Sequence, residues 1–513
     1  MTAASDGTAV VAVDFGASSI RVCRVDLGQR PPELEVVHRY RHGPIADASG
    51  HLRWDWERLM AELDKGLGGA LERGPVASIG VDTWGVDYGL LDHRGELVAP
   101  PFSYRDARTD GWSAVVKRIG DDRLYAVTGV QFLPFNTIFQ VASHDQGELA
   151  RARHLLMLPE LIVHHLTGAI VAEPTSAGTT ALVDIHSGEW SPELAQAVGL
   201  DQALLAPIAP AGTCVGRWHG IPVHLVGGHD TASAVVAMGA HPGRTSAFVS
   251  SGTWMIVGRE RPTPDLSDDA RRANFSNERG AFGSIRFLKN LAGSWLLEGC
   301  RAAWGDPPID DLLAVAAQLP SGPVVDVADT RFLHPDDMLD EVTSAAGLPR
   351  DTSPVVVTRC IVDSMAEGTA RVLDELTQVP RGVLWTEVVA EQPSRYTVAN
   401  ATNGSGPSGP TSRPDQETSG RPSDQAVTRR ALAEPVLTEV YVFGGGSRSA
   451  LYRRTLAERT GLPVYAGPVE ATALGNALVQ GIALGVYAGL DDARASLADK
   501  GDEGRAAETD DEG

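Results

Sequence analysis

Apolar residues near the start of the chain recur in patterns that predict strands and a helix. Residues 9–15 (AVVAVDF) form a largely apolar run typical of a buried strand, residues 20–27 (IRVCRVDL) alternate, and residues 34–43 (LEVVHRYRHG) predict a third strand. The small-residue turn GASS between the first two strands predicts a hairpin. Residues 54–71 then place apolar side chains at helical spacing, and residues 76–92 predict two more strands around a polar turn.

A similar order of elements returns in the second half of the sequence. Residues 244–260 predict a strand, a small polar turn and a strand, and residues 284–304 pass from strand to helix. Residues 439–461 predict a strand, three glycines and a helix. We therefore expect an α/β protein with two halves built on one plan. The predicted domains are residues 1–239 and residues 240–490.

Two segments lack the apolar content that a folded core requires. Residues 401–430 contain no Leu, Ile, Phe, Tyr, Trp or Met, so we expect a disordered insertion over about residues 391–434. A G-x-G-x-x-G pattern inside it has neither a strand before it nor a helix after it, which argues against a dinucleotide site. Residues 491–513 carry nine acidic against three basic side chains and predict a solvated, mobile terminus.

Composition and charge limit the classes of function. The 513 residues are 43% hydrophobic, with no apolar run long enough for a membrane span and no basic segment typical of a signal peptide. Four scattered cysteines without a C-x-x-C pair favour a reducing, cytoplasmic setting. The net charge of −22 would repel a nucleic-acid backbone, although glycine turns can still bind an anionic nucleotide locally. We therefore expect neither a membrane nor a nucleic acid as partner, and the oligomeric state stays open.

Three turns of small residues at strand ends are candidates for binding phosphate. They are Asp14–Arg21, Ser250–Trp254 and Phe443–Ser449, and no P-loop, G-x-S-x-G or H-E-x-x-H motif competes with them. Each alone could be an ordinary turn, but three turns placed symmetrically in two halves favour a nucleotide site. Within the first turn, Arg21 adds positive charge and Asp14 could hold Mg²⁺ through water.

An acid stands where another strand gives way to a helix, in the segment VGGHDTASAVVAM (residues 226–238). Near two phosphate-binding turns, Asp230 is placed to act as a general base. It would take the proton of a substrate hydroxyl as that oxygen attacks a γ-phosphoryl group. The helix that starts at about Thr231 would direct its positive end toward the site. The alternative for Asp230 is a helix N-cap, which spacing alone slightly favours.

Eight segments, in their order along the chain, resemble the rhamnulokinase branch of the FGGY-type sugar kinases. The segments are VDFGASS, IGVDTWGVDYGLLD, YRDARTDG, GVQFLPFNT, HDTASAV, SSGTW, LKN and AGPVEATALGNALVQ. The resemblance runs from about residue 9 to about residue 490, with a gap over 380–435. It implies an α/β fold of two actin-like, ribonuclease-H-like domains with a cleft between them. It also implies transfer of phosphate from ATP, with Mg²⁺, to the 1-hydroxyl of the ketose L-rhamnulose in L-rhamnose breakdown.

Matching positions in these motifs imply roles for individual residues, with Asp230 as the catalytic base. The implied sugar contacts are Gly85, His229, Asp230, Thr231 and Asn290. The implied nucleotide contacts are Ala17, Ser18, Ser19, Ile20, Arg21, Thr253, Glu298 and Gly445. Two of these depart from the family. Ile20 replaces a glycine, which puts close backbone approach in doubt, and Glu298 replaces a glutamine, so its carboxylate would have to face the ribose or the metal.

Several alternatives remain open on the sequence alone. Trp84 could pack on a sugar or fill the core, while Asp82 and Asp87 could bind sugar hydroxyls or backbone groups. The closest rival function is a kinase for another ketose, of the fuculose or xylulose type. Others are an actin- or chaperone-like ATP-binding protein without sugar kinase activity, and a non-catalytic sugar sensor, whose only support is Ile20.

Overall fold

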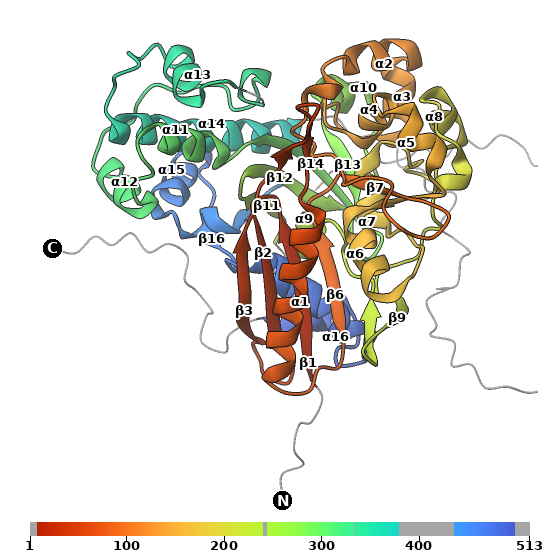
Figure 1. The fold of residues 1–513 in the computed structure, drawn as a ribbon. Helices are drawn as coiled ribbons and strands as arrows, with labels where there is room; N and C mark the ends of the chain where they lie inside the picture. Colours follow the sequence, from red (N-terminus) through yellow and green to blue (C-terminus); the bar gives the residue numbers. More distant parts are fainter. Residues whose placement is uncertain (1–7, 240–243, 334, 379–435, 498–513) are drawn as a thin grey trace, which may run out of the picture. The chain divides into compact units, whose positions relative to one another are not determined.

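The computed structural model describes residues 8–239, 244–333, 335–378 and 436–497. Within these residues the chain forms two six-stranded sheets, one from each half of the sequence (Figure 1). The first sheet contains, in spatial order, β3 (Glu33–Arg41), β2 (Ser19–Asp26), β1 (Ala9–Gly16), β6 (Ile79–Thr83), β10 (Ile221–His224) and β9 (Cys214–Trp218). The second contains β13 (Ser276–Arg279), β14 (Ile285–Ala292), β12 (Trp254–Arg261), β11 (Ser246–Ser251), β15 (Glu439–Phe443) and β16 (Val464–Ala466).

Both sheets follow one plan. In the first sheet β3, β2 and β1 pair antiparallel, and β1 and β6 then pair parallel to their next neighbours, β6 and β10. In the second sheet β14, β12 and β11 pair antiparallel, and β11 and β15 pair parallel with β15 and β16. The prediction of two α/β halves with one order of elements is therefore confirmed. The division of the chain at residue 240 stays a prediction, since residues 240–243 lie outside the described residues.

Helices cover the sheets and fill the space beside them. In the first half they are α1 (Trp56–Glu72), α2 (Trp112–Ile119), α3 (Asp121–Thr128), α4 (Thr137–Ala142), α5 (Gln146–Arg151), α6 (Leu158–Thr167), α7 (Pro174–Ala177), α8 (Pro192–Ala197) and α9 (Asp230–Val236). In the second half they are α10 (Asp268–Arg272), α11 (Trp295–Ala303), α12 (Ile309–Ala316), α13 (Met338–Ala345), α14 (Pro354–Gln378), α15 (Ala450–Thr460), α16 (Ala471–Ala483) and α17 (Leu490–Ala495). Two short strand pairs are β4 (Ile45–Ala46) with β5 (Leu52–Arg53) and β7 (Tyr88–Leu91) with β8 (His154–Met157).

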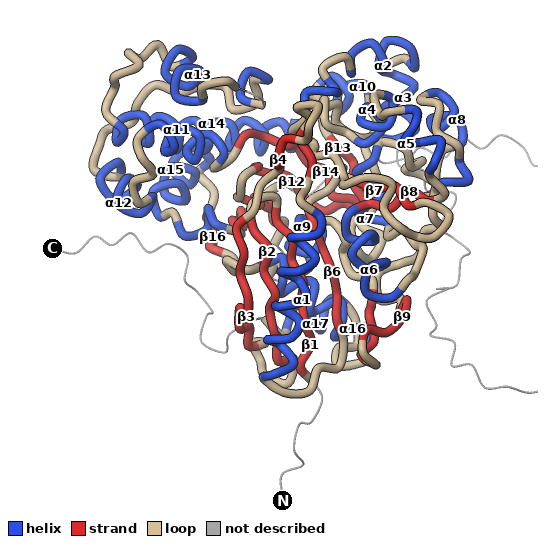
Figure 2. Tube along the Cα trace, in the orientation of Figure 1, coloured by secondary structure: helices blue, strands red, loops and turns tan. Residues whose placement is uncertain are grey.

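Strand β1 is buried on both faces, which explains its nearly continuous apolar sequence. Val11 and Val13 belong to a core cluster shared with α1, which lies along this sheet in Figure 2. Val10 and Ala12 belong to a different cluster, shared with α9 and α16. Because side chains alternate along a strand, Asp14 faces the same side as Ala12. The first acid of the chain's opening hairpin therefore points toward α9, the helix that begins with Asp230.

The hairpin, the first helix and the later strands form where the apolar pattern places them, but the C-terminal segment differs from the prediction. Helix α17 covers Leu490–Ala495, so the prediction of a mobile terminus from residue 491 was wrong over residues 491–495. Ala493 is buried, and the Arg494 guanidinium donates to the carbonyls of Val235 and Val236 and pairs with Glu260 at 2.6 Å. These contacts hold α17 against the fold, although its acidic composition does not indicate a packed helix in the sequence.

The predicted insertion over 391–434 and the rest of the acidic tail, residues 498–513, lie outside the described residues. Of the helices that the structure does describe, none is both long enough and apolar enough to cross a lipid bilayer.

Candidate active site

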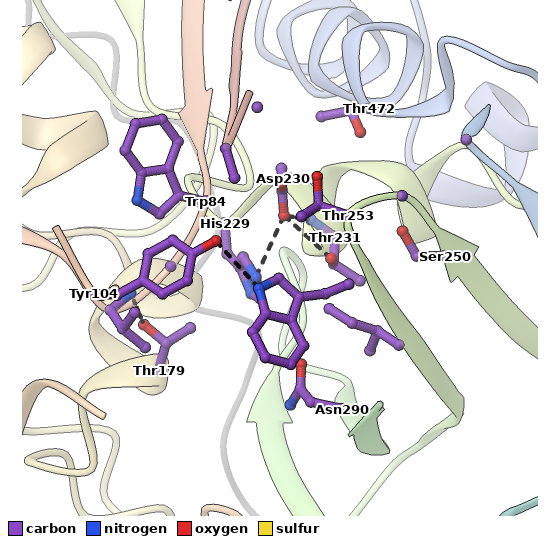
Figure 3. Close-up of a pocket in the computed structure, with 18 of the residues that line it drawn as sticks. Trp84, Tyr104, Thr179, His229, Asp230, Thr231, Ser250, Thr253, Asn290 and Thr472 are labelled. Carbon is purple, nitrogen blue, oxygen red and sulfur yellow. Dashed lines mark hydrogen bonds and ion pairs between the residues drawn. The ribbon is translucent and has the colours of Figure 1, made fainter. Parts of the chain in front are cut away.

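A cavity of about 320 Å³ is lined by residues from both halves of the chain. Figure 3 shows these side chains around it, with Asp230 beside Thr231 and Thr253. Most residues that the sequence assigns to a site line this cavity, namely Ala17, Ser18, Ser19, Arg21, Gly85, His229, Asp230, Thr231, Thr253, Asn290 and Gly445. Segments more than 400 residues apart in the sequence thus meet at one place, as the strand-end turns predict.

Asp230 is the first residue of α9, and its side chain is 27% exposed to the cavity side. Its Oδ1 accepts hydrogen bonds from the backbone N–H of Thr231 at 2.6 Å and from the Thr231 hydroxyl at 3.1 Å. The N-cap position falls on His229, whose side chain caps nothing, so the N-cap alternative for Asp230 is wrong. The second carboxylate oxygen remains available to a ligand in the cavity.

The turn that precedes Asp230 is fixed by buried polar groups. The N–H of Thr83, at the end of β6, donates to the carbonyl of Gly228 at 2.8 Å, which extends the first sheet by one bridge. On the other side the N–H of Gly228 donates to Oε2 of Glu173 at 3.0 Å, and the N–H of His229 donates to the Thr175 hydroxyl at 3.1 Å. The backbone that leads into α9 is therefore held from two sides. These contacts also fix the position of Asp230, the first residue of α9.

Glu173 belongs to a pair of fully buried carboxyl groups that the sequence analysis did not single out. Glu160 accepts from the N–H of Glu173 at 2.9 Å and from the Ser176 hydroxyl at 2.5 Å. Burial raises the pKa of Glu160 to about 8 and the pKa of Glu173 to about 7. Their sequence signal is weak, because an acid at the start of a helix is an ordinary capping residue.

A second unpredicted group lies beside His229, and one of its members, Glu278, lines the cavity. Glu278 and Arg286 face each other across β13 and β14, with Oε2 and Nη2 3.1 Å apart. His229 lies against both, with its Nδ1 3.1 Å from Nη2 of Arg286. Burial raises the pKa of Glu278, but Arg286, His229 and Ser276 together lower it by more, so that pKa lies below its usual value.

Asp14 and Asp82 form a buried acidic pair at the neighbouring ends of β1 and β6. Oδ2 of Asp14 is 2.8 Å from the Arg21 guanidinium, which also pairs with Glu470 at 2.6 Å, and Oδ2 of Asp82 accepts from Asn476 at 2.6 Å. Burial raises the pKa of Asp14 to about 6, Arg21 lowers it, and the charges of Asp230 and Glu470 raise it further. The pKa of Asp82 is raised as well, first by burial and then by Asp14.

The residues around Asp14 fit a hydrated magnesium ion. Oδ1 of Asp14 and Oδ1 of Asp82 are buried and have no hydrogen-bond partner, and hard carboxylate oxygens are what Mg²⁺ prefers. Among the described residues no group of three His, Cys, Asp or Glu side chains converges on one point as a ready metal site. Asp14 is fully buried and does not line the cavity, so a cation in the cavity would reach it only through water, and its role stays a prediction.

The three small-residue turns lie together, and glycine is required where two of them approach. A Cβ on Gly446 would lie 2.1 Å from Oγ of Ser251, and Gly444 has a φ of +79°, a left-handed conformation that favours glycine. The first turn contributes residues 17–19, and the last contributes Gly444 and Gly445. These turns offer backbone N–H groups and hydroxyls at the cavity surface, which suits a phosphate chain.

Two of the predicted nucleotide contacts lie elsewhere. The Ile20 side chain is fully buried in the core cluster shared with α1, because it alternates with Arg21 along β2 and faces away from the cavity. Glu298 lies on α11 with 44% of its side chain exposed and pairs with Arg301, outside the cavity lining. Neither residue lines the cavity, and the nucleotide contacts implied for them stay predictions. Ile20 no longer supports the sensor alternative, since it does not intrude on the site.

The sugar-side candidates form a polar and aromatic wall. Asn290 donates from its backbone N–H at 2.8 Å and from its amide at 3.1 Å to Oε1 of Gln131, which also lines the cavity and was not predicted. Gly85 lies against the Thr179 side chain, and the Thr179 hydroxyl accepts from the N–H of Val86. Amide and hydroxyl groups fixed in this way are suited to reading sugar hydroxyls.

The positions of Asp82 and Asp87 argue against sugar contact, whereas both roles of Trp84 stay predictions. Trp84 is 6% exposed, contributes to the core and touches the cavity. Asp87 is fully buried and accepts from the indole N–H groups of Trp54 and Trp84 at 2.7 and 2.9 Å, so it supports Trp84 from behind. Asp82 bonds to Asn476 of α16. Neither acid lines the cavity, so neither is placed to touch a sugar.

Comparison with known proteins identifies the family. The model of the N-terminal domain of the FGGY family of carbohydrate kinases matches residues 9–239, and that of the C-terminal domain matches residues 247–484. The chain belongs to the FGGY family of carbohydrate kinases. Its relatives include a rhamnulokinase of Klebsiella pneumoniae (strain 342), 35% identical over 95% of this chain and 92% of that protein. A second rhamnulokinase, from Klebsiella pneumoniae subsp. pneumoniae, is 35% identical over 94% of this chain and 91% of its own length.

Solved structures of FGGY-type kinases share the fold. A ligand-bound xylulose kinase from Lactobacillus acidophilus aligns with a TM-score of 0.70 at 14% identity, over 96% of this chain and 92% of its own. A glycerol kinase of Plasmodium falciparum with ADP aligns with a TM-score of 0.66 at 13% identity, over 96% and 93% of the two chains. The predicted fold of two actin-like domains is therefore confirmed, and so is the expectation of an FGGY carbohydrate kinase.

Proposed function

We propose that this FGGY kinase transfers the γ-phosphoryl group of ATP to the 1-hydroxyl of L-rhamnulose, in L-rhamnose breakdown. The observation that carries the proposal is the Asp230 carboxylate, which faces a cavity with phosphate-suited turns on one side and fixed amide and hydroxyl groups on the other. The particular sugar is supported by the 35% identity to two Klebsiella rhamnulokinases over nearly the whole chain.

In the proposed reaction Asp230 accepts the proton of the 1-hydroxyl while its oxygen attacks the γ-phosphorus and the ADP oxygen leaves. We assign the sugar to the wall formed by Gly85, His229, Thr231 and Asn290. We assign the phosphates to Ala17, Ser18, Ser19, Arg21, Thr253 and Gly445. A magnesium ion bound with ATP would neutralise charge on the β- and γ-phosphates, and Asp14 would hold it through water. In this assignment residues 1–239 bind mainly the sugar and residues 240–490 the nucleotide.

A panel of ketoses tests the substrate. L-Rhamnulose, L-fuculose and D-xylulose are compared in a coupled assay of ADP release, and kcat/KM should be highest for L-rhamnulose. A preference for another ketose would assign the chain to the rival ketose kinases of the same family. ATP turnover that is indifferent to every sugar would instead support an ATP-binding protein of the actin or chaperone type.

Replacing the proposed base tests the mechanism separately. Asp230→Asn should lower kcat by about 10²–10⁴-fold, the usual contribution of a general base, while calorimetric binding of ATP and sugar stays close to that of the wild type. Asp311→Asn, at an exposed acid on α12, is the matched control and should leave kcat unchanged. An Asp230→Asn enzyme with wild-type turnover would remove Asp230 from the mechanism.

A further inference from the structure

Arg286 is an arginine in the interior of a sheet that directs its charge at a histidine of the cavity. Its side chain is fully buried in β14, and Nη2 lies 3.1 Å from Nδ1 of His229. The same nitrogen lies 3.1 Å from Oε2 of Glu278, its cross-strand partner on β13, and donates to the carbonyl of Arg279 at 3.3 Å. Two hydrogen-bond acceptors and the Glu278 carboxylate therefore surround one guanidinium nitrogen, which leaves Arg286 little freedom to turn.

The contact with Arg286 determines where His229 carries its proton. A guanidinium group has only hydrogen-bond donors and keeps its charge at all ordinary pH values, so Nδ1 of His229 must be the acceptor. An imidazole that accepts at Nδ1 carries its single proton on Nε2. Nε2 of His229 lies 3.4 Å from Oδ1 of Asp230, on the cavity side of the ring (Figure 3).

The competing arrangement would place the proton on Nδ1 and direct it at Glu278. Oε2 of Glu278 is 3.4 Å from Nδ1, farther than the Arg286 nitrogen at 3.1 Å. A proton on Nδ1 would also meet the N–H of Arg286 head-on, donor against donor. Oε1 of Glu278 accepts from the Ser276 hydroxyl at 3.1 Å, whereas Oε2 makes no hydrogen bond within the described residues and is paired with Arg286 by charge at 3.1 Å.

We propose that Arg286 is a positioning residue that holds His229 in the tautomer protonated on Nε2, so that His229 offers a donor to the cavity beside the Asp230 acceptor. A hydroxyl group has both a lone pair and a proton. His229 can donate to the lone pair, and Asp230 can accept the proton. The proton would go to Asp230, and the N–H of His229 would fix the oxygen through a lone pair. The last step rests on the proposed kinase function, whereas the tautomer itself does not.

Charged groups from three elements face His229. Glu278 and Arg286 face it from β13 and β14 and offset each other, while Asp230 faces it from α9 and the buried Glu173 lies behind the turn. Burial lowers the pKa of Arg286, but a guanidinium starts so high that it stays charged. Nδ1 of His229 therefore contacts a permanent cation, which can only donate to it.

The tautomer can be measured on the full-length wild-type protein without any ligand. Histidine is labelled with ¹⁵N, and the His229 ring signals are assigned by their loss in His229→Gln. We expect Nδ1 to have the chemical shift of an unprotonated nitrogen and Nε2 that of a protonated one. A protonated Nδ1 in the wild type would overturn the proposal. Because no sugar or nucleotide is present, this result is independent of whether the ketose assignment succeeds or fails.

Variants then test whether Arg286 is the cause. Glu278→Gln keeps the Arg286 donor and should keep the Nε2–H tautomer. The double variant Arg286→Met, Glu278→Gln avoids an unpaired buried charge and should lose the fixed tautomer. Relative to Glu278→Gln, its kcat should fall at least about tenfold, because the reacting oxygen loses an oriented partner, with KM for ATP unchanged. Arg286→Lys retains a cationic donor and should recover part of kcat. A folded double variant that still shows the Nε2–H tautomer, or a change of tautomer in Glu278→Gln alone, would contradict the assignment.

Discussion

Gly475 is the position where the packing of α16 against α9 is least tolerant, and α9 begins with the proposed catalytic base. A Cβ added at Gly475 would lie 1.7 Å from the carbonyl oxygen of Ser233, 2.7 Å from its carbonyl carbon and 3.2 Å from the backbone nitrogen of Ala237. All three are backbone atoms of α9 or its C-cap, so no change of rotamer can relieve the contact. We therefore predict that Gly475→Ala displaces α9.

The size of the effect follows from these distances. An ordinary contact needs about 3.4 Å, so the added carbon and the Ser233 oxygen must separate by about a further 1.7 Å. Overpacking of a filled core costs about 1–3 kcal/mol, and a rigid backbone contact belongs at the upper end of that range. A shift of about 1 Å at a catalytic group can cost about 10²-fold in rate. The side-chain amide of Asn476, the next residue, donates to Oδ2 of Asp82 at 2.6 Å. The same movement should therefore also disturb the pair Asp14 and Asp82.

Urea unfolding and the coupled ADP assay measure the two effects. Gly475→Ala should lower the free energy of unfolding by about 1–3 kcal/mol and kcat by roughly 10²-fold. The matched control is Gly68→Ala on α1, where an added Cβ meets nothing within 4 Å. That control should be neutral or stabilising by up to about 1 kcal/mol, because alanine is the better helix former. Wild-type stability and turnover in Gly475→Ala would show that the α9–α16 contact does not position Asp230.

Two further predictions concern buried carboxyl groups. Burial raises the pKa of Glu160 to about 8, so the folded state binds a proton that the unfolded state releases. The free energy of unfolding should therefore fall as pH rises from about 5 to 8. For this group the fall is at most about 1.4 kcal/mol per pH unit. Urea unfolding at several pH values should give a flatter profile for Glu160→Gln, and equal slopes would contradict the reasoning. With ATP present, adding Mg²⁺ should raise the melting temperature of the wild type and of Asp311→Asn further but not that of Asp14→Asn, since Asp14 is the proposed magnesium anchor. An equal shift in Asp14→Asn would place the ion elsewhere.

Those parts of the fold that depend on local pattern could be predicted from the sequence. The strand residues of β1 are apolar because both faces are covered, and residues 17–19 are small because the hairpin turns there. Asp230 could be identified as a candidate catalytic residue because an acid that closely follows two glycines at the start of a helix is unusual. Helix α17 was missed because its acidic composition outweighs the single buried face of Ala493.

The supporting residues of the site could not be predicted, because their meaning depends on partners distant in the sequence. Arg286 lies 57 residues from His229, and nothing in the letters around it distinguishes a buried arginine from one on an exposed strand face. The sequence indicates that Glu173 is a helix cap, and its Oε2 does cap α7. The same Oε2 also accepts from the N–H of Gly228. Alternation along β2 could have shown that Ile20 and Arg21 face opposite ways, and this would have removed the doubt about Ile20.

The distribution of charge around the cavity explains why a nucleotide should need a cation there. Asp14 and Asp230 interact strongly enough for the charge of Asp230 to raise the pKa of Asp14, and Arg21, which lies beside Asp14, shares its charge with Glu470. A bare triphosphate entering the turn at residues 17–19 would add negative charge to this group. The pKa of Asp14 is raised to about 6, chiefly by burial, and a divalent ion nearby would stabilise its ionised form. The cost of burying Asp14 and the proposed binding of a magnesium ion are thus two aspects of one electrostatic arrangement.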